Sequence, residues 1–119
     1  MSNELRVRTN KHLTILTNDP SMTAWGFAVL KNNVVLNVGC IKTIPENKKT
    51  RIRKSDDTIR RVSEINKKLI ELIETYGIDF IVSESPHGSQ NASAAVMIGI
   101  VAGMLQTLAD VKQIPIEWY

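Results

Sequence analysis

The feature that most constrains the fold is a helix pattern, followed at once by a strand pattern and then a second helix pattern. Between residues 55 and 76, apolar side chains recur at steps of three and four, which is the period of an amphipathic helix. Gly77 is typical of the position that ends a helix. Residues 78–84 then read as a buried strand, and 92–108 as a second, strongly apolar helix. This alternation predicts an α/β fold with helices packed on a sheet.

The N-terminal half adds strand patterns without helices between them. Apolar runs at 13–16, 25–30 and 34–41 predict three strands, and 114–119 predicts a last one. Asn32 and Asn33 tolerate positive φ, so we expect a tight hairpin between the second and third strands. The expected architecture is a mixed sheet whose first three strands are antiparallel, followed by helix–strand alternation, with helices on its faces.

Length and composition favour one domain. A chain of 119 residues, 43% of them hydrophobic, can bury a single core, and we expect a flexible arm at 1–11 and one domain at 12–119. The N-terminus lacks a signal-type apolar segment, and we expect no membrane span, which predicts a cytoplasmic protein. Cys40 is the single cysteine, so it has no disulfide partner within the chain, and we expect it to pack as a small apolar side chain.

Positive charge gathers in one part of the chain. Residues 42–68 hold ten of the fifteen Lys and Arg residues and four acidic residues, which gives this window about +6 in a chain of net charge +3. Such a run is either a solvated loop and helix start or a surface for a phosphate-rich partner. Asp56 and Asp57 within it are explained as acids in the first turn of a helix that Ser55 caps.

Two carboxylates stand at the ends of predicted strands. Asp19 follows the first strand, and Glu84 ends the fourth. The right-handed crossover rule makes these strands neighbours, so the two acids are expected side by side at the edge where ligands of α/β sheets bind. Asp19 either turns the chain together with Pro20 or holds a cation that offsets its burial; Glu84 either holds that cation or bonds to the following loop. Mg²⁺ or Mn²⁺ would suit such oxygen ligands.

Several segments together resemble one known family. The stretches ILTNDPSMTAWGFAVL, NVGCIKT, residues 56–105 and the final IPIEWY are similar to RuvC-type Holliday-junction resolvases of the ribonuclease H-like superfamily, and the resemblance covers about residues 12–119. In that family the first strand carries a catalytic aspartate, and the fourth strand ends in a catalytic glutamate. The resemblance therefore implies a ribonuclease H-like fold with Asp19 and Glu84 as catalytic and metal-binding residues.

The same resemblance implies substrate, partner and cofactor. It predicts a Mg²⁺- or Mn²⁺-dependent endonuclease that cuts four-way DNA junctions as a homodimer. The family's remaining acidic ligands lie on a helix after the last strand. We expect the domain to lack that helix, and therefore expect weak metal binding and little cleavage by these 119 residues alone. The basic candidates for phosphate contacts are Lys48, Lys49, Arg51, Arg53, Lys54, Arg60 and Arg61.

The loop after Glu84 adds further polar candidates. His87 either contacts a phosphate, a base or the attacking water, or is a solvated loop residue. Ser89, Gln90 and Asn91 either bind DNA backbone or cap the following helix, and one role does not exclude the other. Trp25 and Trp118 are expected in the core rather than as stacking platforms.

Two other readings remain open at this point. The first is a catalytically incomplete DNA-binding or scaffolding member of the same fold. The second is a fragment of the actin-like ATPase class, whose phosphate loop also follows a first-strand aspartate. That class needs two larger lobes, which 119 residues do not supply.

Overall fold

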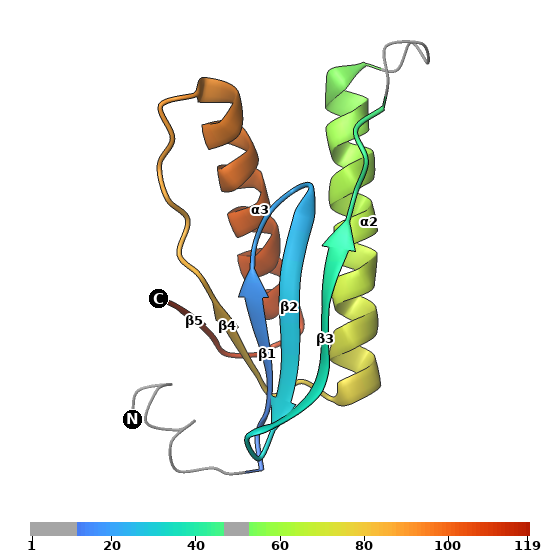
Figure 1. Ribbon diagram of the computed structural model, residues 1–119, viewed down its shortest axis with the longest axis vertical. Coiled ribbons are helices and arrows are strands. Elements are labelled where there is room, and N and C mark those ends of the chain that lie inside the picture. The colour runs from blue at the N-terminus through green and yellow to red at the C-terminus, as the bar shows by residue number, and fades with distance from the viewer. Residues whose placement is uncertain (1–11, 47–52) are drawn as a thin grey trace.

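The computed structural model describes residues 12–46 and 53–119, and the predicted arm at 1–11 lies outside them. Their core is a five-stranded sheet in the order β3-β2-β1-β4-β5 (Figure 1). The strands are β1 (Thr14–Asp19), β2 (Ala24–Lys31), β3 (Val34–Lys42), β4 (Phe80–Ser83) and β5 (Ile116–Trp118). The helices are α2 (Lys54–Tyr76) and α3 (Ala92–Val111). Every predicted strand and helix is present, with ends shifted by a few residues.

Strand directions confirm the predicted mixed sheet. β1, β2 and β3 pair antiparallel, whereas β4 is parallel to β1 and β5 is parallel to β4. Asn32 and Asn33, between β2 and β3, have φ of 53° and 62°, which is the left-handed conformation that a two-residue hairpin turn requires.

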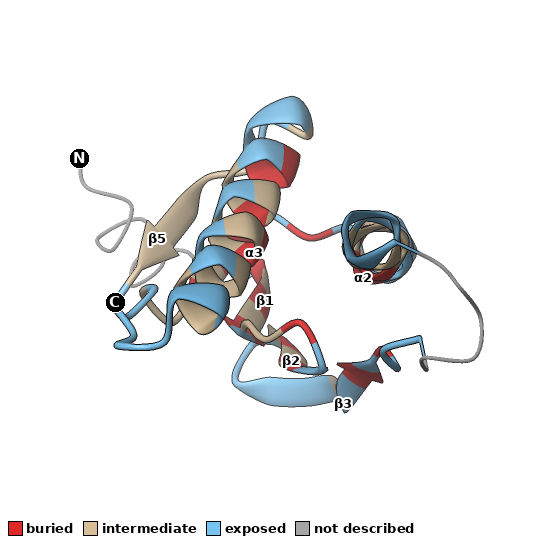
Figure 2. Ribbon diagram, turned by 90° about the horizontal axis from the view of Figure 1, so that it is seen from above, coloured by how far each residue is buried: buried red, intermediate tan, exposed pale blue. Residues whose placement is uncertain are grey.

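Both described helices cover the same face of the sheet, whereas the sequence indicated only that helices lie on its faces (Figure 2). The chain moves from β3 through α2 to β4, then through α3 to β5, so both crossovers advance in the same direction along the sheet. Two right-handed crossovers in one direction place both helices on one side. The core lies between this face and the helices, and includes the fully buried Leu16, Trp25, Ile65, Leu69 and Leu105.

Helix α2 begins one residue before its predicted cap. Arg53 is the N-cap residue and makes no capping side-chain hydrogen bond, so the prediction that Ser55 caps the helix is wrong. Asp56 and Asp57 do lie in the first turn, where the helix dipole favours acidic side chains. Gly77 adopts φ of 62° and its N–H donates to the carbonyl of Ile73, which ends the helix as expected.

Helix α3 holds two glycines four residues apart, Gly99 and Gly103, a spacing that can allow close packing against a neighbouring backbone. A Cβ added to Gly99 or Gly103 would meet no atom within 4 Å, so these glycines do not mark a close backbone approach among the described residues. By length and composition alone, Ala92–Val111 also meets the criteria for a membrane span, which the sequence analysis did not expect. Core helices of soluble proteins meet the same criteria but are mostly buried, whereas 22% of this window is buried among the described residues.

The edge strand β3 overturns one side-chain prediction. Cys40 is exposed rather than packed in the core, because the next residue, Ile41, is the buried one and successive side chains of a strand point to opposite faces. Trp25, by contrast, is fully buried on β2, as expected. Trp118 on β5 is half-buried, and its indole N–H donates to Gln106 Oε1 at 2.9 Å.

Candidate functional site

The ends of β1 and β4 lie side by side. Asn18 is paired with Ser83 in the parallel register, and the backbone N–H of Glu84 donates to the carbonyl of Asn18 at 3.1 Å. Asp19 and Glu84 are the next residues along each strand, so they leave the sheet at the same edge. The crossover argument from the sequence is confirmed at this point.

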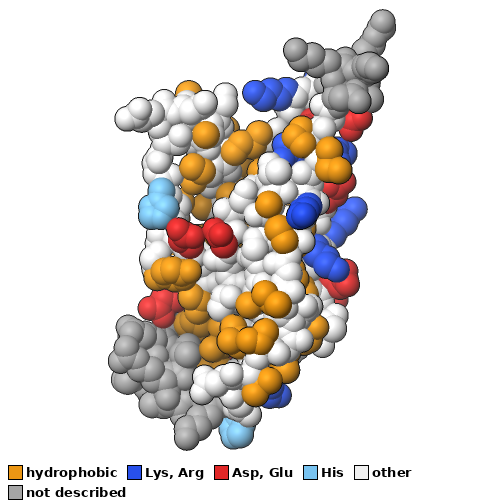
Figure 3. Space-filling model, in the orientation of Figure 1, with side chains coloured by type: hydrophobic (Ala, Val, Ile, Leu, Met, Phe, Trp, Pro, Cys, Tyr) orange, Lys and Arg blue, Asp and Glu red, His pale blue; other side chains and the backbone are white. Residues whose placement is uncertain are grey.

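A small pocket of about 190 Å³ lies at this edge. Both carboxylates line it, together with residues of the loop after β4, of α3 and of β5. The lining residues are Asp19, Pro20, Glu84, Ser85, Pro86, His87, Ile98, Val101, Ala102 and Trp118. Figure 3 shows acidic side chains beside a histidine on the surface of this part of the molecule.

The two acids are accessible to solvent. Asp19 is exposed and the Glu84 side chain is 41% exposed, so the expected burial of Asp19 is wrong. Neither acid forms an ion pair with Lys or Arg among the described residues. The nearest cationic group is His87, whose Nε2 lies 3.4 Å from Glu84 Oε1 and is charged only when protonated. Two neighbouring carboxylates without a fixed cation leave negative charge facing the solvent.

Asn18 is a buried polar residue at this edge, next to the buried Ser83. Its Nδ2 donates to the carbonyls of Val82 at 3.2 Å and Leu16 at 3.4 Å, and its Oδ1 accepts from the indole N–H of Trp25 at 3.0 Å. One side chain therefore connects β1, β2 and β4 directly below the carboxylates. This network fixes the strand ends from which Asp19 and Glu84 project.

The donor set suits a hard divalent cation, although it is small. Mg²⁺ is commonly held by one or two carboxylates, with water and substrate phosphate completing its shell, and Asp19 and Glu84 supply that minimum from adjacent strands. No group of three His, Cys, Asp or Glu residues within 12–46 and 53–119 is arranged to hold a metal ion. The residues present thus fit a metal that a phosphate ligand helps to retain.

The loop between β4 and α3 holds the remaining polar candidates. His87, Ser89, Gln90 and Asn91 are all exposed. The capping role of Asn91 is confirmed, because its Oδ1 accepts from the N–H of Ala94 at 3.2 Å. Ser89 Oγ accepts from the N–H of Asn91 at 3.2 Å, which holds the turn before the helix. Their exposure also leaves room for contacts with a DNA backbone.

The basic candidates divide into three groups. Lys48, Lys49 and Arg51 lie outside the described residues. Arg53 and Lys54 are exposed at the start of α2, and Arg53 pairs with Asp56 at 2.8 Å. The third group, Arg60 and Arg61, is engaged within the fold.

Arg60 and Arg61 have different partners. Arg60 pairs with Asp57 at 2.8 Å and with Glu64 at 2.9 Å. The hydrogen bond from Arg60 holds the pKa of Asp57 below its ordinary value, although partial burial acts in the opposite direction. Arg61 is only 6% exposed and is bound to Thr43 and Thr23, so it does not belong to an exposed basic surface.

Sequence reasoning missed much of the pocket wall. Pro20, Ser85 and Pro86 adjoin the two acids in the chain, and that adjacency was the available signal. No comparable signal marks Ile98 and the other apolar lining residues of α3, because their place depends on how the helix packs. For Asn18, the available signal was a polar residue at the end of an apolar run that predicts a buried strand.

Comparisons with known proteins bear on the fold. No protein-family model matches the chain, and no curated protein matches it. Among solved structures, RuvC of Thermus thermophilus in complex with a Holliday junction substrate is similar at 19% identity and a TM-score of 0.73, covering 91% of this chain and 65% of that one. A second structure, Thermus thermophilus RuvC, is similar at 18% identity and a TM-score of 0.67, covering 90% of this chain and 63% of that one.

The structural match shows the fold of this chain and how much of the matched protein the chain spans. This chain spans about 65% of the length of the first of these structures. Its strand order, with an antiparallel start followed by parallel strands, agrees with that match. The chain therefore has the ribonuclease H-like fold of RuvC.

Proposed function

We propose that this protein is a RuvC-like, metal-dependent endodeoxyribonuclease that acts on branched DNA. The observation that carries the proposal is the meeting of Asp19 and Glu84 at the ends of two adjacent parallel strands, in one solvent-accessible pocket. The solved RuvC structure of the same fold, which was determined with a Holliday junction substrate, supports a four-way junction as the substrate class.

Asp19 and Glu84 would bind the metal, and neighbouring residues of the chain would fix the position of the two carboxylates. Asp19 and Glu84 supply carboxylate oxygens to Mg²⁺ or Mn²⁺, which when bound activates a water molecule and stabilises the leaving oxygen of a phosphodiester. Asn18 keeps the strand ends in register through its bonds to Val82 and Trp25. His87, 3.4 Å from Glu84 Oε1, is placed to orient that carboxylate or to contact the substrate phosphate.

The partners follow from the same assignment. Exposed Arg53 and Lys54, with Lys48, Lys49 and Arg51, would supply the positive surface for DNA phosphates. Resolution of a four-way junction requires two symmetric cuts, so we propose a homodimer. We propose a cytoplasmic location for this DNA-processing activity.

A second function is favoured by one observation. The described residues contain no group of three potential metal ligands, so this chain is also consistent with a catalytically incomplete member that binds or scaffolds junction DNA. The two functions share the fold and the DNA partner. They differ in whether bound DNA is cut.

The deciding experiment measures binding and cutting in parallel. A labelled four-way junction and a linear duplex are incubated with the protein in Mn²⁺, in Mg²⁺ or in EDTA. We expect junction binding in all three conditions and cutting only with metal. Glu84→Gln should reduce cutting by about 10²-fold or more while retaining junction binding, because it removes a metal ligand without changing the side-chain shape.

The controls separate the two functions. His87→Gln, adjacent to Glu84 but not required as a ligand, should keep metal-dependent cutting at a reduced rate. Metal-dependent cutting that Glu84→Gln leaves unchanged would contradict the proposed site. Junction binding without any cutting would establish the scaffolding function instead.

A further inference from the structure

A second groove adjoins the carboxylate pocket. Its volume is about 330 Å³, and it lies between the turn that follows β1, the middle of α2 and the first half of α3. The lining residues are Pro20, Ser21, Met22, Thr23, Arg61, Ala94, Met97, Ile98 and Val101. Pro20, Ile98 and Val101 also line the carboxylate pocket, so the two hollows are neighbours.

Arg61 is the charged residue of this groove. Its side chain is 6% exposed, and its guanidinium donates from Nε to Thr43 Oγ1 at 2.8 Å and from Nη2 to Thr23 Oγ1 at 2.9 Å. Both partners are neutral hydroxyls. Among the described residues, Arg61 forms no ion pair with a carboxylate.

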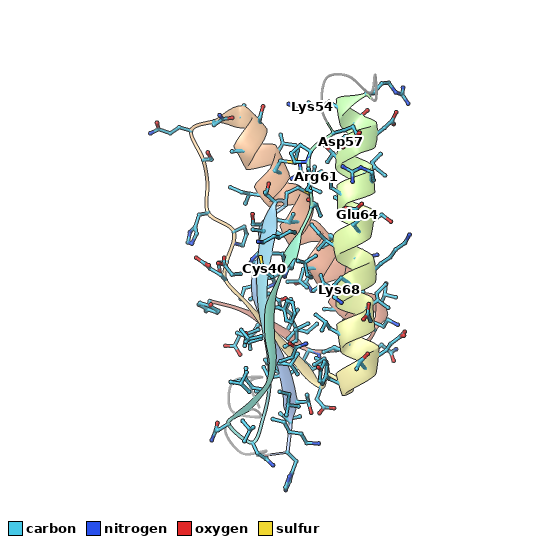
Figure 4. The ribbon with its side chains drawn as sticks, turned by 45° about the vertical axis from the view of Figure 1, so that its right-hand side comes forward. Cys40, Lys54, Asp57, Arg61, Glu64 and Lys68 are labelled. Carbon is cyan, nitrogen blue, oxygen red and sulfur yellow. The ribbon has the colours of Figure 1, made fainter. Side chains whose placement is uncertain are left out.

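The missing ion pair has a structural cause in the neighbouring residue. Figure 4 labels Arg61 with Asp57 and Glu64 on α2, and their spacing of four and three residues places all three on one side of the helix. Both acids are instead held by Arg60, at 2.8 Å and 2.9 Å. Arg60 forms the ion pairs with both acids, whereas Arg61 acts on Asp57 only through a longer-range electrostatic interaction.

A buried cation without a counter-ion is costly, and an anionic ligand removes that cost. The groove suits an anion in other respects. Among the described residues, no Asp or Glu lines it, whereas the hydroxyl-bearing Ser21 and Thr23 do. Ala94, in the first turn of α3, brings the positive end of that helix to the same place.

We propose that this groove is a phosphate-binding site in which the Arg61 guanidinium is the charged ligand and hydroxyls of the β1–β2 turn assist. The phosphate chemistry stands on the groove alone. Its assignment to a backbone phosphate of the DNA strand that enters the carboxylate pocket rests on the proposed function. Free inorganic phosphate is the other source of the same group.

The first arm of the test uses inorganic phosphate as the probe, without DNA. Thermal unfolding is followed in EDTA with increasing sodium phosphate, against sodium chloride at equal pH and ionic strength. We expect a saturable rise in the unfolding midpoint of about 4 °C with wild type, because only the folded chain has the groove. Absence of a saturable rise in wild type would overturn the site.

A matched pair of variants separates the site from the general stabilising effect of phosphate on proteins. Ser21→Asp places a carboxylate in the groove near Arg61. Ser21→Asn places a side chain of the same size as Asp at that position, without the charge. The midpoint shift should be lost in Ser21→Asp and retained in Ser21→Asn. Equal shifts in both variants would overturn the site. Arg61→Gln should also lose the shift; if it does not fold, the Ser21 pair still decides.

The second arm identifies the source of the phosphate. Binding of a labelled four-way junction is measured in EDTA, and Ser21→Asp should bind about tenfold more weakly than Ser21→Asn. A phosphate shift with equal junction affinities would keep the site and overturn its assignment to DNA. A missing phosphate shift beside intact metal-dependent junction cutting would overturn this site and leave the proposed nuclease standing.

Discussion

The first half of α2 and the ends of β1 and β4 both carry acidic side chains, but only the acids of α2 form ion pairs with arginine among the described residues. On α2, Asp56 pairs with Arg53, and Asp57 pairs with Arg60. At the strand ends, Asp19 and Glu84 share a pocket, and His87 is the one potentially cationic side chain among the described residues that forms an ion-pair contact with either acid. The fold itself accounts for the acids of α2. It does not account for those at the strand ends, which is why we propose a ligand for them.

The largest effect is expected below the strand ends. Asn18→Leu leaves the indole N–H of Trp25 without its acceptor and removes a donor from the carbonyl of Val82. Buried polar groups left unpaired cost free energy, so unfolding in urea should show a loss of roughly 2–3 kcal/mol. If the strand ends depend on this network, metal-dependent cutting should fall as well.

Thr17→Val is the control for that variant. Thr17 is the neighbour on β1, half-buried, and makes one long hydrogen bond of 3.4 Å to the carbonyl of Ala28. Its loss should cost less than about 1 kcal/mol. Equal losses in the two variants would show that Asn18 is no more than an ordinary strand position.

The second-largest expected effect is stabilisation of the fold by Mn²⁺, which tests whether the acids at the strand ends bind a metal. Mn²⁺ should raise the stability of wild type, by about 1.4 kcal/mol when its free concentration is tenfold above the dissociation constant. Asp19→Asn and Glu84→Gln should each abolish this response, because each removes one of two carboxylate ligands. Thermal unfolding in Mn²⁺ and in EDTA measures it.

Asp57→Asn is the matched control on α2. Its carboxylate is held by Arg60, so removing it should leave the response to Mn²⁺ intact. If Asp57→Asn lost the stabilisation by Mn²⁺ and Asp19→Asn kept it, the result would contradict the proposed site and indicate that the metal binds on α2.

The sequence predicted the elements and the meeting of the two acids for a physical reason. The spacing at which apolar residues recur predicts each helix and strand from its own segment of sequence. The handedness of the crossovers then places β4 beside β1. Asp19 and Glu84 follow from those two facts alone.

Other properties depend on packing that one sequence does not encode locally. Both helices lie on one face because of the strand order, and Cys40 is exposed because it points to the other face. Arg60 and Arg61 are adjacent and identical in type, yet one is paired with acids and the other is buried beside hydroxyls. Their separation depends on the direction in which each projects from α2, so the sequence placed both in a single basic surface.

A smaller effect concerns the basic surface. Lys54→Glu at the start of α2 should weaken junction binding and reduce the slope of log affinity against log salt by about 1, since one phosphate contact releases about one counterion. Lys68→Glu is the control, because Lys68 lies on the same side of α2 about 21 Å along the helix and pairs with Glu71. Equal changes in both variants would indicate a general charge effect instead of a contact at the start of α2.

The smallest effect is the pH dependence of the α2 ion pair. Arg60 lowers the pKa of Asp57, so the ionised carboxylate stabilises the fold above the ordinary pKa of Asp, and this contribution is lost as pH falls through the lowered value. Wild type should therefore be more stable than Asp57→Asn at pH 7 and pH 5, and the difference should shrink toward pH 3 in urea titrations. A difference that grows toward acid would mean that the carboxylate is destabilising when charged. Asp56→Asn should have less effect, since both Asp56 and Arg53 are well exposed and water screens their attraction.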